Sequence, residues 1–263
     1  MRFLKHIPNT LTSLNLVCGC LALVQIFSGD LHLAALLVFL AVLFDFFDGF
    51  AARLLKAYSP IGKDLDSLAD MVSFGLVPGF MMFRLIQFAL LANNEKELFW
   101  IAVQNNIQHV ELENNPQLLG AWSMYLPYLA LLIPVFSALR LAKFNNDSRQ
   151  GDQFIGLPTP ANALLIAGLV LNLDHPTTLM MGMNNVYSLV LGCVLMSYLL
   201  VAEWPLLALK FKTYTWKENS MRYSLLGLSA LLLALFQIRA IPLLILLYIL
   251  ISTVNNIFFK ARH

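Results

Sequence analysis

Long apolar runs separated by short polar connections recur along the whole chain. We predict eight membrane-spanning helices from these runs, because a hydrocarbon core about 30 Å thick requires roughly 20 residues of apolar helix. The predicted spans cover residues 11–28, 32–57, 64–92, 119–143, 158–174, 186–203, 222–238 and 241–259. Residues 1–10 carry Arg2 and Lys5 ahead of the first run and predict a short interfacial helix at the N-terminus.

The composition agrees with an all-α, polytopic integral membrane protein. Hydrophobic residues make up 59% of the 263 residues and charged residues only 12%, whereas soluble domains carry about 25% charged residues. The net charge of +2 gives no indication of nucleic-acid binding, and we expect none.

Basic residues are distributed unevenly between the two sides of this topology. With the N-terminus inside, all but three of the 17 Lys and Arg residues fall on the inner side, the exceptions being Lys96, Arg239 and Arg84. The positive-inside rule therefore favours cytoplasmic termini and rejects the opposite orientation.

Four aspartates lie where the second and third predicted spans meet. Asp45 and Asp48 are three residues apart, and Asp66 and Asp70 are four apart, so each pair shares one helix face. The two helices are antiparallel and joined by a short inner connection. Both pairs are therefore expected to face each other at one membrane depth.

Four carboxylates cannot remain ionised together at low dielectric without cations. Hard oxygen ligands favour Mg²⁺, Mn²⁺ or Ca²⁺ over zinc or copper. Two such ions, bridged by shared carboxylates, would neutralise a pyrophosphate and polarise its phosphorus. Gly49 and Gly62 would let a bulky ligand approach the backbone, Ala52 would keep the wall low, and Arg53 could donate two hydrogen bonds to a phosphate.

Acidic residues inside a membrane protein also occur as structural groups, as partners of arginine or along ion pathways. A cation transporter would distribute its acids across the membrane depth, or place them at broken helices near the midplane. The four aspartates instead cluster at one inner level beside Arg53 and glycines. This pattern favours an enzyme over a transporter.

The spacing Asp-x₂-Asp-Gly-x₂-Ala-Arg-x₈-Gly-x₃-Asp-x₃-Asp resembles the signature of the CDP-alcohol phosphotransferase family. Its fixed positions are Asp45, Asp48, Gly49, Ala52, Arg53, Gly62, Asp66 and Asp70. The resemblance implies a membrane enzyme with a core of six helices, commonly a homodimer. Such an enzyme displaces CMP from a CDP-linked donor with an alcohol, using Mg²⁺ or Mn²⁺, with Ca²⁺ as an ion that could bind in vitro.

The same resemblance implies roles for individual residues. Asp45, Asp48 and Asp66 would be metal ligands, and Asp70 would contact the metal and act as the general base. The donor-binding positions would be Asp48, Gly49, Ala52, Arg53 and Gly62, together with Asn9 in the segment before the first span.

Three further stretches, 65–75, 138–145 and 154–161, resemble the membrane-embedded, serine-transferring members of the family. They imply CDP-diacylglycerol as donor and L-serine as acceptor, with membrane lipids around the protein. Arg140 and Lys143 are candidates to bind the serine carboxylate, although they could also be positive-inside residues only. The signature itself leaves other acceptors open, such as glycerol phosphate or inositol phosphate.

Taken as a whole, the sequence predicts a catalytic membrane domain over residues 1–203 and two additional C-terminal helices over 204–263. We find no chemistry in the last two helices. We expect a multi-pass protein of the cell inner membrane, with its termini and active site on the cytoplasmic side.

Overall fold

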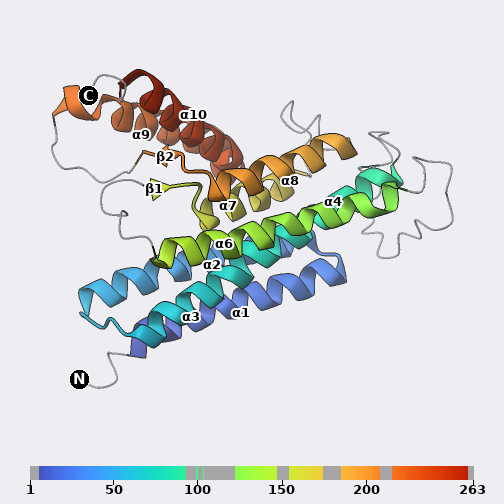
Figure 1. Ribbon diagram of the computed structural model, residues 1–263, viewed down its shortest axis with the longest axis horizontal. Coiled ribbons are helices and arrows are strands. Elements are labelled where there is room, and N and C mark those ends of the chain that lie inside the picture. The colour runs from blue at the N-terminus through green and yellow to red at the C-terminus, as the bar shows by residue number, and fades with distance from the viewer. Residues whose placement is uncertain are drawn as a thin grey trace.

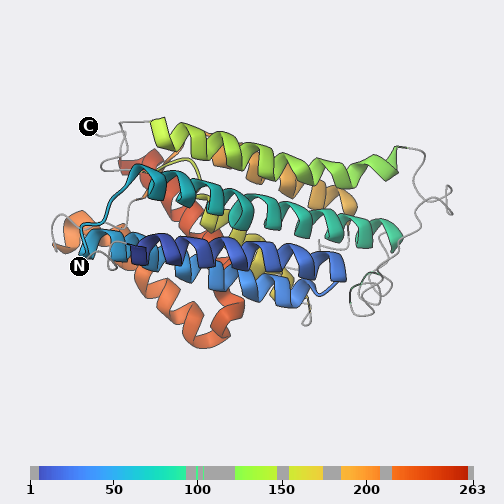
Figure 2. The ribbon, with the colours of Figure 1, turned by 90° about the horizontal axis from the view of Figure 1, so that it is seen from below.

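The protein is an elongated bundle of helices that run side by side (Figures 1 and 2). The computed structural model describes residues 6–92, 99, 103, 122–146, 154–173, 185–207 and 215–259. In this part of the chain the only strands are β1 (Phe154–Ile155) and β2 (Pro205–Leu206), an antiparallel pair that the sequence did not predict.

The first half of the chain forms a hairpin of long helices followed by a third. Helix α1 spans Ile7–Ser28 and α2 spans Leu31–Leu54. Gly29 lies between them with φ 88°, a left-handed conformation that suits glycine, and the Asp30 carboxylate accepts the Leu33 N–H at 2.8 Å to cap α2. The third long helix is continuous and consists of α3 (Pro60–Asp70), the π-helical segment η2 (Met71–Leu76) and α4 (Val77–Leu91). We call it the third rod.

The second half contributes shorter helices and a C-terminal pair. The order is η4 (Ser123–Leu131), α6 (Leu132–Asn146), α7 (Thr159–Leu171), α8 (Val186–Val201), α9 (Trp216–Phe236), η6 (Gln237–Ala240) and α10 (Ile241–Phe259). Helix α6 packs on α8, and α7 packs on α2, α4 and α10. The end of α2, the start of α3 and the end of α6 lie toward one end of the bundle (Figure 1).

Small residues allow close approach of α1, α2 and the third rod. Ala22, Ala34, Ala35 and Ala41 are fully buried in the core. A β-carbon at Gly19 would lie 2.4 Å from Ser73 Oγ and 3.0 Å from Ser73 Cα, so only glycine fits there. This contact holds α1 against η2.

The helices are those of an all-α membrane protein. Five helical stretches are long and apolar enough to cross a membrane: Ile7–Ser28, Leu31–Leu54, Pro60–Leu91, Ser123–Asn146 and Asn219–Asn256. Large apolar side chains cover their outer faces, including Val17, Phe27, Leu43 and Leu250. A surface of this kind belongs in lipid.

Every predicted span overlaps a helix, but their number stays a prediction. Helices α7 and α8 are shorter than 18 residues, and the last two predicted spans both overlap the single stretch Asn219–Asn256. The chain bends between them at Gln237, whose φ is 52°. Residues 7–10, expected in a separate interfacial helix, form the first turn of α1 instead, and residues 1–5 lie outside the described part.

Candidate active site and metal centre

Three aspartates from two helices bring their carboxylates together. Asp45 and Asp48 lie near the end of α2 and Asp66 lies on α3, and one oxygen of each lies within 4.8 Å of the others. Oxygens bound to Mg²⁺ or Ca²⁺ at about 2.0–2.6 Å can be up to about 4–5 Å apart. The three carboxylates therefore have the chemistry and the spacing to hold a hard divalent cation.

Asp70 lies one helical turn beyond Asp66 and is deeper in the bundle. Its side chain is 8% exposed, and its Oδ1 accepts a hydrogen bond from Asn15 Nδ2 at 3.3 Å. It interacts electrostatically with Asp45 and Asp66, but it is not one of the three aspartates whose oxygens converge. A metal set of four aspartates stays a prediction.

Helix α1 supplies two polar side chains that the sequence interpretation missed. Thr12 Oγ1 lies 2.7 Å from Asp48 Oδ2 and donates to it, and Asn15 holds Asp70. Both are buried and lie three residues apart on one face of α1. The i, i+3 spacing of Thr12 and Asn15 was the signal that could have indicated their role, since buried polar groups in a helix normally have a hydrogen-bond partner.

The segment η2 fixes the position of Asp70 relative to α1. Ser73 Oγ donates to the Asn15 carbonyl at 3.0 Å, on the same residue whose side chain holds Asp70. The π-helical winding of η2 begins immediately after Asp70. Such segments often occur at functional sites.

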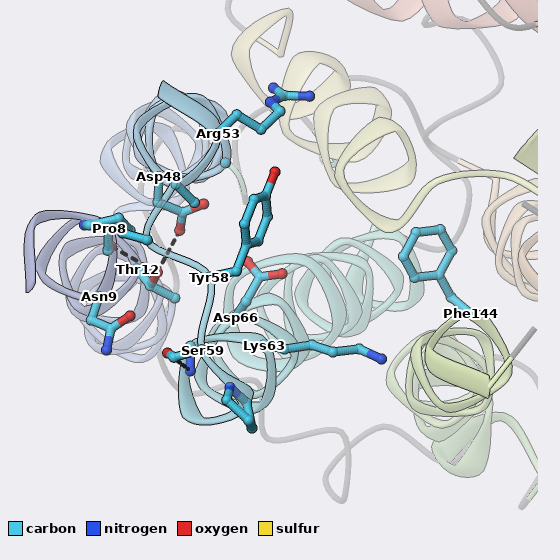
Figure 3. A pocket seen from close by; sticks show the side chains of 15 residues that line it. Pro8, Asn9, Thr12, Asp48, Arg53, Tyr58, Ser59, Lys63, Asp66 and Phe144 are labelled. Atoms are coloured by element: carbon cyan, nitrogen blue, oxygen red, sulfur yellow. Dashed lines mark hydrogen bonds between the residues drawn. The ribbon is translucent and has the colours of Figure 1, made fainter. Parts of the chain in front are cut away.

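A cavity of about 750 Å³ opens beside the aspartates, at the end of the bundle where α2 ends and α3 begins. All six positions predicted to bind the donor line it: Asn9, Asp48, Gly49, Ala52, Arg53 and Gly62. Tyr58 and Lys63, which the sequence did not single out, also line it, and Phe144 of α6 stands across the opening (Figure 3).

The two glycines of the cavity differ in their surroundings. A β-carbon on Gly49 would have no atom of the described residues within 4 Å, so Gly49 leaves open space for a ligand. A β-carbon on Gly62 would lie 2.9 Å from Asn9 Oδ1 and 3.0 Å from Ser59 Oγ. Gly62 therefore also serves the packing of α3 against the start of α1, a role that was not predicted.

The two candidate acceptor residues, Arg140 and Lys143, line a separate small cavity near the donor cavity. Arg140 is 7% exposed, interacts electrostatically with Asp70 and lies over the Phe144 ring at 5.4 Å. Lys143 is exposed, and its Nζ lies 2.9 Å from Glu203 Oε1 in a salt bridge. Phe144 lines both cavities.

The family model described as CDP-alcohol phosphatidyltransferase matches residues 5–209. The chain belongs to this family. The matched region of this CDP-alcohol phosphatidyltransferase includes every residue of the aspartate cluster and every residue that lines the two cavities. It ends between α8 and α9, so the predicted division at residue 203 stays a prediction.

Curated relatives are similar over most of this family member's length. A protein from Bacillus subtilis named CDP-diacylglycerol–serine O-phosphatidyltransferase is 28% identical, over 76% of this chain and 89% of its own. A protein of the same name from Methanocaldococcus jannaschii is 28% identical over 78% of each chain. Another of that name, from Helicobacter pylori, is 27% identical over 97% of this chain and 92% of its own.

Proposed function

We propose that this protein is a metal-dependent CDP-diacylglycerol–serine O-phosphatidyltransferase. The observation that carries the proposal is the convergence of Asp45, Asp48 and Asp66 beside a cavity large enough for a nucleotide headgroup. The names of the three similar proteins support serine as the acceptor.

The donor would bind with its cytidine diphosphate in the 750 Å³ cavity and its acyl chains in lipid. Gly49 leaves room beside the backbone, and Arg53 carries an exposed guanidinium suited to a phosphate. Mg²⁺ or Mn²⁺ held by Asp45, Asp48 and Asp66 would supply charge neutralisation for the pyrophosphate and the departing CMP. A second ion would require Asp70 as a further ligand.

Asp70 is the proposed general base. It would take the proton of the serine hydroxyl as that oxygen forms a bond to the phosphorus of the phosphatidyl group, while the bond from this phosphorus to CMP breaks. Asn15 orients the Asp70 carboxylate through its hydrogen bond. Positioning and charge stabilisation suffice for such a displacement, so no covalent enzyme intermediate is required.

Arg140 is the proposed partner of the serine carboxylate, because it is a buried cation that interacts electrostatically with Asp70. We expect Arg140→Ala to raise the serine KM while the CDP-diacylglycerol KM changes little. A serine KM equal to that of the unaltered protein would remove this contact. Lys143 is a weaker proposal, since Glu203 already neutralises it.

The proposal extends to the setting of the enzyme. We infer a homodimer in the cell inner membrane, with eight spans and a cytoplasmic active site. The excess of basic residues on one side supports this orientation. Labelling of single cysteines introduced at the two ends of the bundle, in intact and in opened cells, would test it.

The direct test is an assay of purified protein with CDP-diacylglycerol and labelled L-serine, glycerol phosphate, inositol phosphate and other alcohols. We expect phosphatidylserine and CMP in equal amounts, and only when Mg²⁺ or Mn²⁺ is present. Transfer to a different alcohol would assign another acceptor, and full activity after rigorous chelation would refute the metal-dependent chemistry.

A further inference from the structure

Five buried polar side chains on three helices have atoms with no hydrogen-bond partner among the described residues. They are Ser137 and Arg140 on α6, Thr159 and Asn162 on α7, and Ser197 on α8. For Asn162 both the amide oxygen and the amide nitrogen are unpaired, and the side chain is fully buried. A buried polar group without a partner is costly, so native proteins rarely keep several together without a use.

The hydroxyl groups of this set also differ from others in the chain. Ser13, Ser67 and Thr253 each donate to the carbonyl four residues earlier in their own helix, which is the usual way for a helical hydroxyl to be satisfied. The hydroxyls of Ser137, Thr159 and Ser197 make no such bond. Within the described part of the protein they have no partner at all.

The elements that carry these groups meet around the segment that follows Asp70. Helices α6 and α7 both pack on η2, and α6, α7 and α8 contact one another. A β-carbon on Gly75 of η2 would lie 3.1 Å from Ser137 Cβ, so Ser137 faces η2 directly. Arg140 is one turn further along α6 and interacts electrostatically with Asp70.

The start of α7 is fixed against the end of α8 by backbone hydrogen bonds. Leu157 N–H donates to the Leu199 carbonyl at 2.9 Å, and Gly156 N–H donates to the Trp204 carbonyl at 3.0 Å. Gly156 has φ 77°, and a β-carbon there would lie 2.6 Å from the Leu200 carbonyl oxygen. No side chain caps α7, and the N–H groups of Thr159 and Ala161 lie at the positive end of its dipole, Pro160 having none.

We propose that these groups recognise the amino-acid part of the acceptor, with Asn162 as the central specificity residue. This inference rests on the proposed function. The serine carboxylate binds Arg140 and the start of α7. The serine ammonium donates to Asn162 Oδ1 and to the hydroxyls of Ser137 and Ser197. This arrangement leaves the serine hydroxyl toward Asp70.

The free space beside Arg140 is only about 10 Å³, which is the size of one water molecule. Of the five polar groups only Arg140 lines this space, so serine binding requires side chains to move, including Arg140 from its place over Phe144. Because Phe144 also lines the donor cavity, that movement connects the polar set to the donor site.

The test is Asn162→Leu, which keeps the volume of the side chain and removes its polar atoms, measured in the purified full-length protein. We expect the serine KM to rise about 10- to 100-fold, the effect of losing one or two hydrogen bonds to a charged group, with the CDP-diacylglycerol KM within about twofold. We also expect reduced preference for serine over glycerate, which has a hydroxyl in place of the ammonium.

The matched control is Asn172→Leu at the C-terminal cap of the same helix. Asn172 is buried too, but its Nδ2 donates to the Gly168 and Arg239 carbonyls at 2.8 and 3.2 Å. This variant is expected to lower the unfolding temperature and leave the serine KM unchanged. If Asn162→Leu does not fold, Thr159→Val and Ser137→Ala remove single hydroxyls and carry the same expectation for the serine KM.

The possible outcomes separate the two proposals. No transfer to serine by the unaltered protein refutes the proposed function. Normal transfer by the unaltered protein, with an unchanged serine KM and unchanged serine preference in the variants, refutes the role of Asn162 and its neighbours alone. Equal increases in both KM values indicate a general structural role and also overturn this inference.

Discussion

Replacing Thr12 with valine tests whether α1 orients a carboxylate of the metal centre. Thr12 Oγ1 donates to Asp48 Oδ2 at 2.7 Å in a buried position, and valine has the same shape without the hydroxyl. The hydrogen bond fixes one carboxylate oxygen and so orients the other. Thr12→Val leaves Asp48 in place but lets its carboxylate rotate.

The expected loss follows from the strength of that bond. A buried hydrogen bond to an ionised group contributes about 1.5–3 kcal/mol, and each 1.4 kcal/mol corresponds to about a factor of ten. Loss of a residue that orients a metal ligand typically weakens metal affinity by about 10- to 100-fold. We therefore expect the concentration of Mg²⁺ or Mn²⁺ for half-maximal activity to rise about 10- to 100-fold.

The assay is phosphatidylserine formation as a function of metal concentration, together with calorimetric titration of the metal without substrate. At saturating metal the variant should recover most of its kcat, because the ligands themselves are retained. Thr12→Ser should behave like the unaltered protein. The control is Ser13→Ala, since Ser13 donates only to the Asn9 carbonyl at 2.8 Å. Unchanged metal dependence in Thr12→Val would refute the reasoning.

Three other predictions concern the base, the metal and the packing of α1. Asp70→Asn should lower kcat by about 100- to 10,000-fold, the usual contribution of a general base, while the unfolding temperature in detergent is retained; near-normal turnover would remove Asp70 as the base. Chelation should abolish activity, and Mg²⁺ or Mn²⁺ should restore it. Activity that persists in the chelated enzyme would contradict a metal centre at Asp45, Asp48 and Asp66. Gly19→Ala should destabilise the protein by about 1–3 kcal/mol, because the added methyl meets the Ser73 backbone, whereas Gly192→Ala, with open space around it, should be neutral or stabilising in the same thermal assay.

Local patterns predicted the parts of the structure that depend on a single helix. The 3.6-residue period was enough to place Asp45 and Asp48 on one face of α2 and Asp66 and Asp70 on one face of α3. The short connection between these helices implied that the two faces meet, and the oxygens of Asp45, Asp48 and Asp66 do converge.

Features that depend on which distant segments pack together were not predictable in this way. The hydrogen bond of Thr12 to Asp48 joins residues 36 positions apart, and the salt bridge of Lys143 to Glu203 joins residues 60 apart. The sequence gives no local signal for either pairing. The close approach of Gly62 to the side chain of Asn9 likewise could be predicted only if it were known that α3 packs against α1.

The winding of Met71–Leu76 was hidden for a different reason. Its residues read as ordinary apolar helix, and the difference between α- and π-helical hydrogen bonding is not encoded in hydrophobic periodicity over so short a stretch. The predicted span 64–92 therefore overlapped the rod, which runs from Pro60 to Leu91, but missed its first turn and its change of winding.

That change of winding rotates α4 relative to α3 about their common helix axis. Six residues wound in the wider form lag an α-helix by about one residue, or roughly 100° of rotation. The α3 half, which carries the carboxylates, and the α4 half, which is buried in the core, can thus present faces that one uninterrupted α-helix could not present together. Shortening the segment by a single amino acid would let it rewind as an α-helix with both halves still seated, whereas the same deletion within α3 would turn the carboxylates away from α2.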